Sequence, residues 1–270
     1  AGDVIAVGEK VKRFSEDDRV MPIYMSGWHD GGISERHSGW KGLGGDTDGT
    51  ATELAVFHEE DVAAIPNSLS YEEAACIPCA GVTAWHALIS SGRIKAGDDV
   101  LILGSGGVSI FGLQIALMNG ARVLAISSND KKLEKLRELG ASITINYKNT
   151  PDWDQQILLE TANTGVDHVL EVVGESTMER SIHATAIQGN ISVVGDLSGA
   201  LSQPGTSKRG IRLSEIVVGS RMMMEQLLRA ITLHSKKPVI DRIFPFVELR
   251  DALSYLERGV HVGKVVIKFD

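Results

Sequence analysis

The chain has 270 residues, 43% of them hydrophobic, and a formal net charge of −8 at pH 7. This length accommodates one large domain or two ordinary ones. The acidic balance argues against nucleic acid or an anionic membrane surface as the main partner. No apolar run reaches the roughly 20 residues that span a bilayer, and no signal peptide is recognisable. We therefore expect a cytoplasmic protein.

The N-terminal quarter of the chain is expected to consist of strands and loops. Residues 4–7 and 19–23 are strand-like, and residues 52–57 resume that character. Between them, residues 26–50 are rich in glycine and show little periodicity. A loop of this length is usually functional or disordered.

Two helices are expected next, over residues 71–75 and 81–90. The two cysteines of the chain, Cys76 and Cys79, stand between them in a Cys-x-x-Cys spacing. This spacing is compatible with a redox pair or with half of a zinc site. A structural zinc needs four ligands, however, and the chain has no second cysteine pair. We favour the alternative that the two are small core residues.

A glycine-rich turn is the most informative feature of the sequence. A short apolar run from Val100 leads into Gly104, Ser105, Gly106, Gly107 and Val108, and a helical pattern follows. In a doubly wound sheet, the first glycine of such a turn permits a tight bend. The second removes the Cβ that would block a pyrophosphate at the helix N-terminus. We therefore expect these five residues to cradle the pyrophosphate of a dinucleotide, although Ser109 occupies the third glycine position of the fingerprint.

Strand candidates recur after this turn, with helical segments between most of them. They cover residues 122–126, 142–146, 167–173, 190–194 and 211–218. The chain ends with helices over residues 221–234 and 249–257 and a strand over residues 263–269. The alternation predicts an α/β fold with a doubly wound parallel sheet covered on both faces.

The end of the second of these strands indicates which cofactor binds. A site for NAD places an Asp or Glu there, about 20 residues after the glycine turn, to bind the ribose 2′-hydroxyl. Here the position holds Ser127 and Ser128, with Lys131 and Lys132 close behind. Hydroxyl and ammonium groups suit a 2′-phosphate, so the sequence predicts NADPH. The alternative is that the lysines are solvated and that Asp130 is an ordinary helix N-cap.

Motifs along the whole chain resemble the medium-chain dehydrogenase/reductase superfamily. They are AGDVIAVGE at residues 1–9, DRV at 18–20, EAACIPCAGVTAW at 73–85, GGVS at 106–109, ASITINY at 141–147, GVDH at 165–168 and GKVVI at 263–267. The resemblance is closest to the quinone-reductase-like and zinc-type alcohol-dehydrogenase-like branch. The motifs occur in the order that the family has.

This resemblance implies two domains. A GroES-like β-barrel catalytic domain would comprise residues 1–80 and a returning segment at 218–270, and a Rossmann domain would comprise residues 81–217. The nicotinamide would lie in the cleft between the domains. Family members carry about 65 further residues ahead of the segment that opens this chain. The resemblance therefore implies a catalytic domain of which this chain contains only a part.

Further cofactor contacts follow from the resemblance and from the strand ends. Ser128, Lys132 and Tyr147 would hold the 2′-phosphate, beside Ser127. We expect the backbone at the ends of the last three strands to hold the nicotinamide ribose and carboxamide, through Val173, Gly174, Gly195, Leu197, Ser198, Val218 and Gly219. Lys264 would approach the phosphates, or it is a surface charge.

The expected catalytic residues are Cys79 and Thr83. Cys79 matches the third catalytic zinc ligand of zinc-dependent relatives, but one thiolate cannot hold a catalytic zinc, which usually has three protein ligands. We therefore predict no metal and expect Cys79 to line the nicotinamide pocket. Thr83 would reach cofactor or substrate, or it bonds a backbone carbonyl of its helix. Within the glycine-rich loop Trp28, His29 and Trp40 would shape the substrate pocket, or they only anchor the loop.

The leading expectation is an NADPH-dependent, zinc-free oxidoreductase that transfers hydride between nicotinamide and a quinone, enone or carbonyl/alcohol substrate. One alternative is a zinc-dependent alcohol dehydrogenase with its remaining ligands upstream of residue 1. Another is a non-catalytic NADPH-binding structural protein. We also expect a homodimer, because residues 211–218 should form an apolar outermost strand that invites pairing with a second copy.

Overall fold

The computed structural model describes residues 1–32, 41–195 and 209–269. The chain forms two compact units. The first comprises Ala1–Val82 with Val218–Asp270, and we call it the split unit. The second comprises Thr83–Val217, and we call it the central unit. Within the described ranges, no helix has the length and apolarity needed to cross a membrane.

The central unit is built on a six-stranded sheet with the order β6-β5-β4-β7-β8-β9. Its strands are β4 (Asp99–Leu103), β5 (Arg122–Ser127), β6 (Ile143–Asn146), β7 (Val166–Glu171), β8 (Thr185–Val193) and β9 (Arg212–Glu215). All neighbouring strands are parallel. This is the strand order of a doubly wound dinucleotide-binding sheet, so the predicted α/β class is confirmed.

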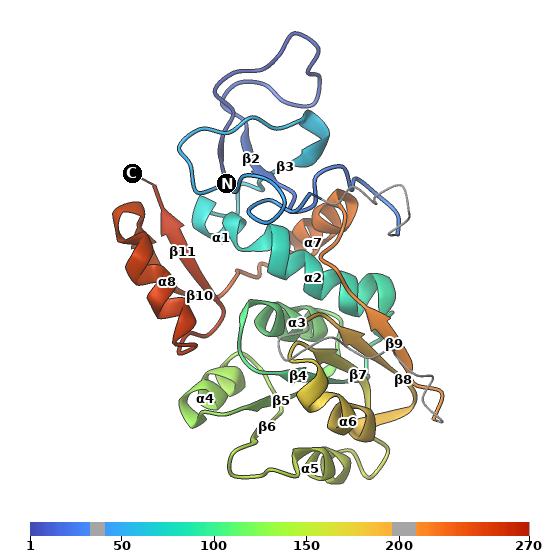
Figure 1. Ribbon diagram of the computed structural model, residues 1–270. Coiled ribbons are helices and arrows are strands. Elements are labelled where there is room, and N and C mark those ends of the chain that lie inside the picture. Colours follow the sequence, from blue (N-terminus) through green and yellow to red (C-terminus); the bar gives the residue numbers. More distant parts are fainter. Residues whose placement is uncertain (33–40, 196–208, 270) are drawn as a thin grey trace. The chain divides into compact units, whose positions relative to one another are not determined.

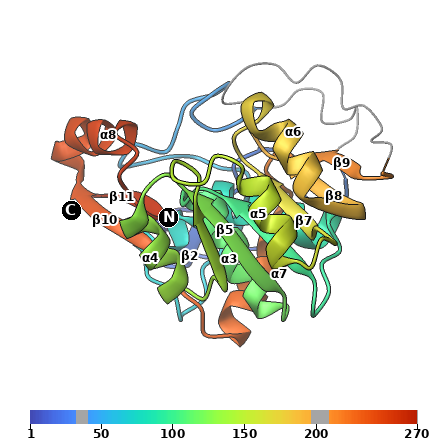
Figure 2. The same cartoon turned by 90° about the horizontal axis from the view of Figure 1, so that it is seen from below.

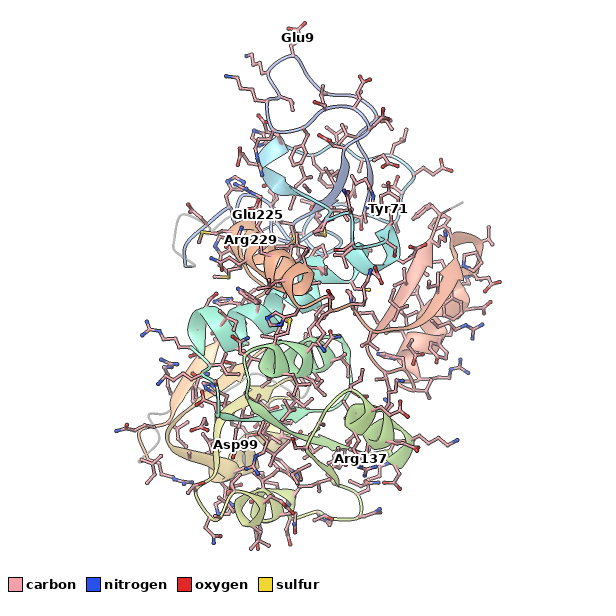
Figure 3. The ribbon with its side chains drawn as sticks, turned by 180° about the vertical axis from the view of Figure 1, so that it is seen from behind. Glu9, Tyr71, Asp99, Arg137, Glu225 and Arg229 are labelled. Atoms are coloured by element: carbon pink, nitrogen blue, oxygen red, sulfur yellow. The ribbon has the colours of Figure 1, made fainter. Side chains whose placement is uncertain are left out.

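Side-chain chemistry sets the pairing at the centre of this sheet. Arg122 is the first residue of β5 and pairs in register with Asp99 of β4. Its guanidinium donates two hydrogen bonds of 2.5 Å to the Asp99 carboxylate. Asp99 is labelled among the side chains in Figure 3. Beyond this pair, Leu101, Leu124 and their neighbours are fully buried. Buried apolar runs of this kind are typical of parallel strands covered on both faces.

In the described part of this unit, four helices connect the strands (Figure 1). They are α3 (Gly107–Met118), α4 (Asp130–Glu138), α5 (Trp153–Glu160) and α6 (Glu175–Ala184). Helices α5 and α6 pack against each other (Figure 2). Trp153 and Ile157 of α5 and Ala184 of α6 belong to one buried cluster with residues of the central strands. The sheet thus has a continuous core beneath these two helices.

The helices predicted before the sheet are confirmed, with a different internal geometry. Helix α1 (Tyr71–Ala75) begins with a capping box in which Ser70 and Glu73 each accept a hydrogen bond from the other's backbone N–H. The second helix is α-helical only over α2 (Val82–Trp85). It is flanked by π-helical turns, η3 (Ile77–Gly81) and η4 (His86–Ser91).

The split unit contains less regular structure than predicted. Its elements are a three-stranded antiparallel sheet of β1 (Gly2–Asp3), β2 (Arg19–Pro22) and β3 (Val62–Ala64), the pair β10 (Ile240–Pro245) and β11 (Lys264–Lys268), and helices η2 (Glu59–Asp61), α7 (Arg221–Leu233), η5 (Phe246–Glu248) and α8 (Leu249–Glu257). The strands expected at residues 4–7 and 52–57 are not present. Val56 is 99% exposed. A strand-like composition alone does not form a strand where no described neighbour pairs with it.

The sheet edge also differs from the prediction. Strand β9 is the outermost strand, as expected, but it covers only Arg212–Glu215 and is not apolar. The Arg212 guanidinium donates to the Asn190 Oδ1 at 2.9 Å and to the Ser91 carbonyl at 2.9 Å. Glu215 is exposed. A short edge strand with charged residues resists uncontrolled pairing better than an apolar edge does.

Candidate dinucleotide-binding site

The glycine turn lies between β4 and α3 and leaves space above the helix. Gly104 has a φ of +75°, where other residues are strained, and its N–H donates to the Ile126 carbonyl at 2.7 Å. Gly106 is the N-cap of α3, with φ of −73° and ψ of −179°. A Cβ built on Gly106 would meet nothing within 4 Å. The backbone is therefore open to a ligand at this point.

The start of α3 is also electrostatically suited to an anion. The helix has 12 residues, no side-chain cap and no acidic residue in its first turn. Its first N–H groups lack partners within the helix, and the helix dipole favours negative charge there. These features fit a pyrophosphate, which supports assigning it to Gly104, Ser105, Gly106, Gly107 and Val108.

Close packing of α3 on the sheet occurs one turn later than the fingerprint suggests. Ser109 is buried, and its hydroxyl donates to the Leu103 carbonyl at 2.7 Å. That bond ties the helix to the end of β4 in spite of the missing glycine. The close approach itself is at Gly112, where a Cβ would lie 2.5 Å from the Leu170 Cδ2.

The residues expected at the 2′-phosphate come together at the carboxyl ends of β5 and β6. Ser127 pairs in register with Asn146, and the Tyr147 N–H donates to the Ser127 carbonyl at 3.1 Å. Ser128 follows directly and is half-buried. The Tyr147 side chain is 41% exposed, so its hydroxyl is accessible to a ligand.

Lys132 lies in the first turn of α4, next to this group. The N-cap of α4 is Asn129, whose Oδ1 accepts from the N–H groups of Lys131 and Lys132. The expectation that Asp130 is the cap is wrong by one residue. Asp130 is the first helical residue, and its carboxylate accepts from the Asn146 Nδ2 at 2.7 Å. Lys132 is half-buried, whereas Lys131 is exposed.

The end of β7 contains a functional candidate that the sequence motifs do not reveal. Glu171 has no exposed surface, and its Oε1 accepts hydrogen bonds from the N–H groups of Val173 and Gly174. Both predicted contact residues are thus oriented by one carboxylate. The signal in the sequence is a charged residue inside an apolar run. Gly195 follows β8, and Leu197 and Ser198 lie outside the described residues.

The remaining predicted residues near the nicotinamide belong mostly to the split unit. Gly219 packs so closely on Val82 that a Cβ would lie 2.5 Å from the Val82 Cγ1. Val218 has a φ of +37°, which is strained for a β-branched residue. Thr83 is buried and opens the central unit. The strained φ of Val218 and the close approach at Gly219 indicate that the surrounding structure fixes the backbone here.

The two cysteines have different environments. Cys76 is buried, its Sγ donates to the Glu72 carbonyl at 3.2 Å, and burial raises its pKa to about 11. Cys79 is exposed, although the surrounding protein still desolvates its sulfur and raises the thiol pKa. The Lys264 ammonium opposes both pKa shifts, which places it near both thiols. Only Cys76 therefore fits the interpretation as a buried core residue.

The glycine-rich loop is anchored on α7. Trp28 is buried, and its Nε1 donates to the Gly31 carbonyl at 3.1 Å. The carbonyls of Trp28 and His29 accept from the N–H groups of Arg221 and Met222. The His29 Nε2 lies 2.8 Å from the Asp61 Oδ1. These contacts hold Trp28 and His29 in place, and Trp40 lies outside the described residues.

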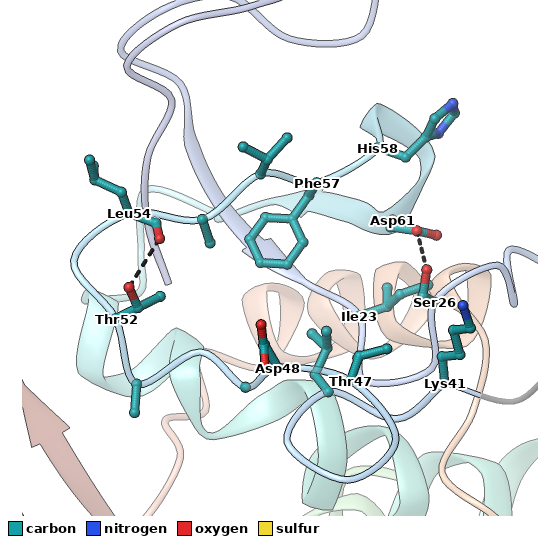
Figure 4. Close-up of a pocket in the computed structure, with 15 residues that line it drawn as sticks. Ile23, Ser26, Lys41, Thr47, Asp48, Thr52, Leu54, Phe57, His58 and Asp61 are labelled. Carbon is teal, nitrogen blue, oxygen red and sulfur yellow. Dashed lines mark hydrogen bonds between the residues drawn. The ribbon is translucent and has the colours of Figure 1, made fainter.

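A pocket of about 840 Å³ lies in the split unit (Figure 4). Ile23 and Phe57 contribute apolar walls, and the Ser26 hydroxyl donates to the Asp61 Oδ2 at 2.5 Å on its polar side. The predicted site residues are not among those lining it. Within the described ranges, no group of three or more His, Cys, Asp or Glu side chains could hold a metal ion.

Comparison with known proteins places the chain in a family. A family model described as zinc-binding dehydrogenase matches residues 107–232. A zinc-type alcohol dehydrogenase-like protein of Schizosaccharomyces pombe is 40% identical over 281 residues, which cover 100% of this chain and 80% of that protein. The 2-methylene-furan-3-one reductase of Solanum lycopersicum is 33% identical over 99% of this chain and 61% of its own length.

A solved structure agrees with these matches. The crystal structure of a putative alcohol dehydrogenase from Sinorhizobium meliloti superposes with a TM-score of 0.93 at 40% identity, covering 99% of this chain and 80% of that one. The fold and these relatives define a nicotinamide-dependent oxidoreductase. The chain belongs to the zinc-type alcohol dehydrogenase-like proteins of the medium-chain dehydrogenase/reductase superfamily, so the predicted resemblance is confirmed.

Proposed function

We propose that the protein is an NADPH-dependent oxidoreductase that transfers hydride between nicotinamide and a quinone, enone or carbonyl/alcohol substrate, without a catalytic zinc. The observation that carries the cofactor assignment is the chemistry at the carboxyl end of β5. Ser127 and Ser128 stand where a NAD site has a carboxylate, and Lys132 and Tyr147 lie beside them. The one nearby carboxylate in this turn, Asp130, is engaged by the Asn146 amide.

The residues of the central unit divide the cofactor between them. The turn from Gly104 to Val108 would hold the pyrophosphate on the N-terminus of α3. Ser128, Lys132 and Tyr147 would hold the 2′-phosphate through charge-assisted hydrogen bonds. The bound cofactor supplies the hydride. The substrate of the tomato reductase is an enone by its name, which supports that substrate class here.

The donor set of the described residues does not fit a catalytic zinc. Such a site usually needs three protein ligands, and the described residues contain no group that supplies them. We expect turnover that chelators do not reduce and no stoichiometric zinc by elemental analysis. Stoichiometric zinc with chelator-sensitive turnover would favour the zinc-dependent alternative.

The function is tested by titrating NADPH and NADH and by following NADPH oxidation with a panel of enones and quinones. We expect NADPH to bind more tightly and at least one enone or quinone to be reduced. Equal or tighter binding of NADH contradicts the cofactor assignment. Oxidation of simple alcohols without reduction of any enone or quinone contradicts the preferred substrate class.

Lys132→Ala is expected to weaken NADPH binding selectively. A charge-assisted hydrogen bond to a phosphate contributes about 1.5–3 kcal/mol, which corresponds to roughly 10- to 100-fold in affinity. NADH lacks the 2′-phosphate, so its affinity should stay within a factor of about two. Lys131→Ala is the matched control, because Lys131 is the exposed neighbour on the same helix. An equal loss for both cofactors would show that Lys132 acts through the fold.

We propose a homodimer formed through β9. If two copies of this strand pair antiparallel about a two-fold axis centred on the strand, Arg212 of one copy lies opposite Glu215 of the other. Opposite charges in such cross-strand pairs are favourable. We expect light scattering to give a dimer at micromolar concentration. Glu215→Arg should shift it toward monomer, whereas an unchanged dimer would place the interface elsewhere.

A further inference from the structure

Glu171 has a fully buried carboxylate to which, among the described residues, only neutral groups donate. It lies at the carboxyl end of β7 with 0% exposure. Its Oε1 accepts from the Val173 N–H at 2.9 Å, the Gly174 N–H at 3.0 Å and the Thr177 hydroxyl at 2.8 Å. Its Oε2 accepts from the Ser181 hydroxyl. Burying a charge costs free energy. The hydrogen bonds that this carboxylate accepts must offset that cost.

No ion pair within the described part of the chain involves this carboxylate. Its compensation comes from four hydrogen bonds and from the N-terminus of α6, which begins at Glu175. A hydrophobic residue would fill the same space without a desolvation cost. The effect that only the carboxylate provides is therefore to orient the backbone N–H groups that it binds.

Because the peptide unit is planar, the orientation of these two N–H groups also fixes the orientation of two carbonyls. All peptide bonds of the described chain are trans, so each N–H and the carbonyl of the preceding residue point in opposite directions. The N–H groups of Val173 and Gly174 point at Glu171. The carbonyls of Val172 and Val173 must then point away from it. Gly174 has φ of +106° and ψ of −136°, a conformation open essentially to glycine alone.

The turn that contains the two carbonyls follows a strand at the ligand-binding end of a doubly wound sheet. Strands β4 and β7 are neighbours, and the strand order reverses between them. Ligands of doubly wound sheets bind at this switch point, outside the carboxyl ends of the strands. The Gly104 turn follows β4, and the turn at Val173 and Gly174 follows β7. One turn offers N–H donors to an anion, and the other offers carbonyl acceptors.

We propose that Glu171 is a positioning residue for the nicotinamide half of the cofactor. Through the N–H groups of Val173 and Gly174 it directs the carbonyls of Val172 and Val173 toward donors of the ligand. A ribose hydroxyl and a carboxamide NH₂ are the donors that this half of the dinucleotide offers. The inference rests on the proposed binding of NADPH and adds a residue that does not contact the cofactor itself.

The test separates the two halves of the cofactor. The probes are NADPH and adenosine 2′,5′-bisphosphate, which lacks the nicotinamide riboside, and both affinities are measured by calorimetry. Glu171→Ala should weaken NADPH about tenfold or more and leave adenosine 2′,5′-bisphosphate within a factor of about two. Glu171→Asp keeps the charge but withdraws the oxygens by one methylene, and it should show the same selective loss if the alanine variant does not fold.

Two further variants identify the cause. Glu171→Gln retains an oxygen that can accept from the same donors, so it should restore most of the NADPH affinity. Glu175→Gln is the matched control, because it removes an exposed charge from the first turn of α6. Equal weakening of both probes, or unchanged NADPH affinity in a folded alanine or aspartate variant, overturns the proposal. Failure of the wild-type protein to bind NADPH would instead overturn the proposed function.

Discussion

Gly106→Asp is expected to stabilise the fold slightly and to abolish cofactor binding. The backbone of Gly106 is extended, and a Cβ there meets nothing within 4 Å, so the fold accommodates the side chain. An aspartate at this N-cap would satisfy free N–H groups of α3 and interact favourably with the helix dipole, a gain of about 0.5–1 kcal/mol. The same carboxylate would occupy the proposed pyrophosphate position. We expect NADPH affinity to fall more than about 100-fold, since two anions then compete for one site.

Because the variant should gain stability while losing NADPH affinity, general damage to the fold cannot explain the expected result. Thermal unfolding should show an equal or higher Tm, while calorimetry shows no NADPH binding. Gly106→Ala is the matched control, because it fills part of the space without adding charge, and its loss of affinity should be smaller. Wild-type affinity in the aspartate variant would mean that the pyrophosphate does not lie on α3.

The central unit was predictable because its signals are local. The buried runs, the glycine turn and the helical periodicity of residues 100–146 each appear within a short window of sequence. Outside this region the prediction depended on partners that a local pattern does not contain. Residues 52–57 have a strand-like composition but no paired neighbour among the described residues, whereas β10 forms because β11 lies beside it.

The motifs of the candidate site could be read from the sequence, whereas the residues that orient its backbone could not. The open N-terminus of α3 and the serines after β5 follow from residue type and spacing. The hydrogen bonds of Glu171 could not be predicted in this way, because a single charge in an apolar strand does not reveal which N–H groups it binds. The N-cap of α4 was displaced by one residue because Asn129 and Asp130 are both good caps. Only the hydrogen-bond geometry distinguishes them.

Gly112→Val is expected to destabilise the central unit and to weaken cofactor binding at the same time. The glycine lies in α3, and a Cβ would come within 2.5 Å of the Leu170 Cδ2 on β7. Leu170 has no exposed surface, so its side chain has little room to move. Overpacking of this kind costs about 1–3 kcal/mol, equivalent to roughly 2–10 °C in Tm for a chain of this size. Because α3 carries the glycine turn at its N-terminus, its displacement from the sheet should also weaken NADPH binding.

A double-mutant cycle with Leu170→Ala tests this mechanism directly. The single Leu170→Ala variant leaves a cavity and should destabilise by about 2–5 kcal/mol. In the double variant the valine fills part of that cavity, so the combined loss should be smaller than the sum by at least about 1 kcal/mol. NADPH affinity should recover in parallel, since α3 can return to its place on the sheet. Strictly additive losses of unfolding free energy would show that Gly112 and Leu170 do not share this contact. Gly112 would then not provide the close helix–sheet packing that the third glycine of the fingerprint usually provides.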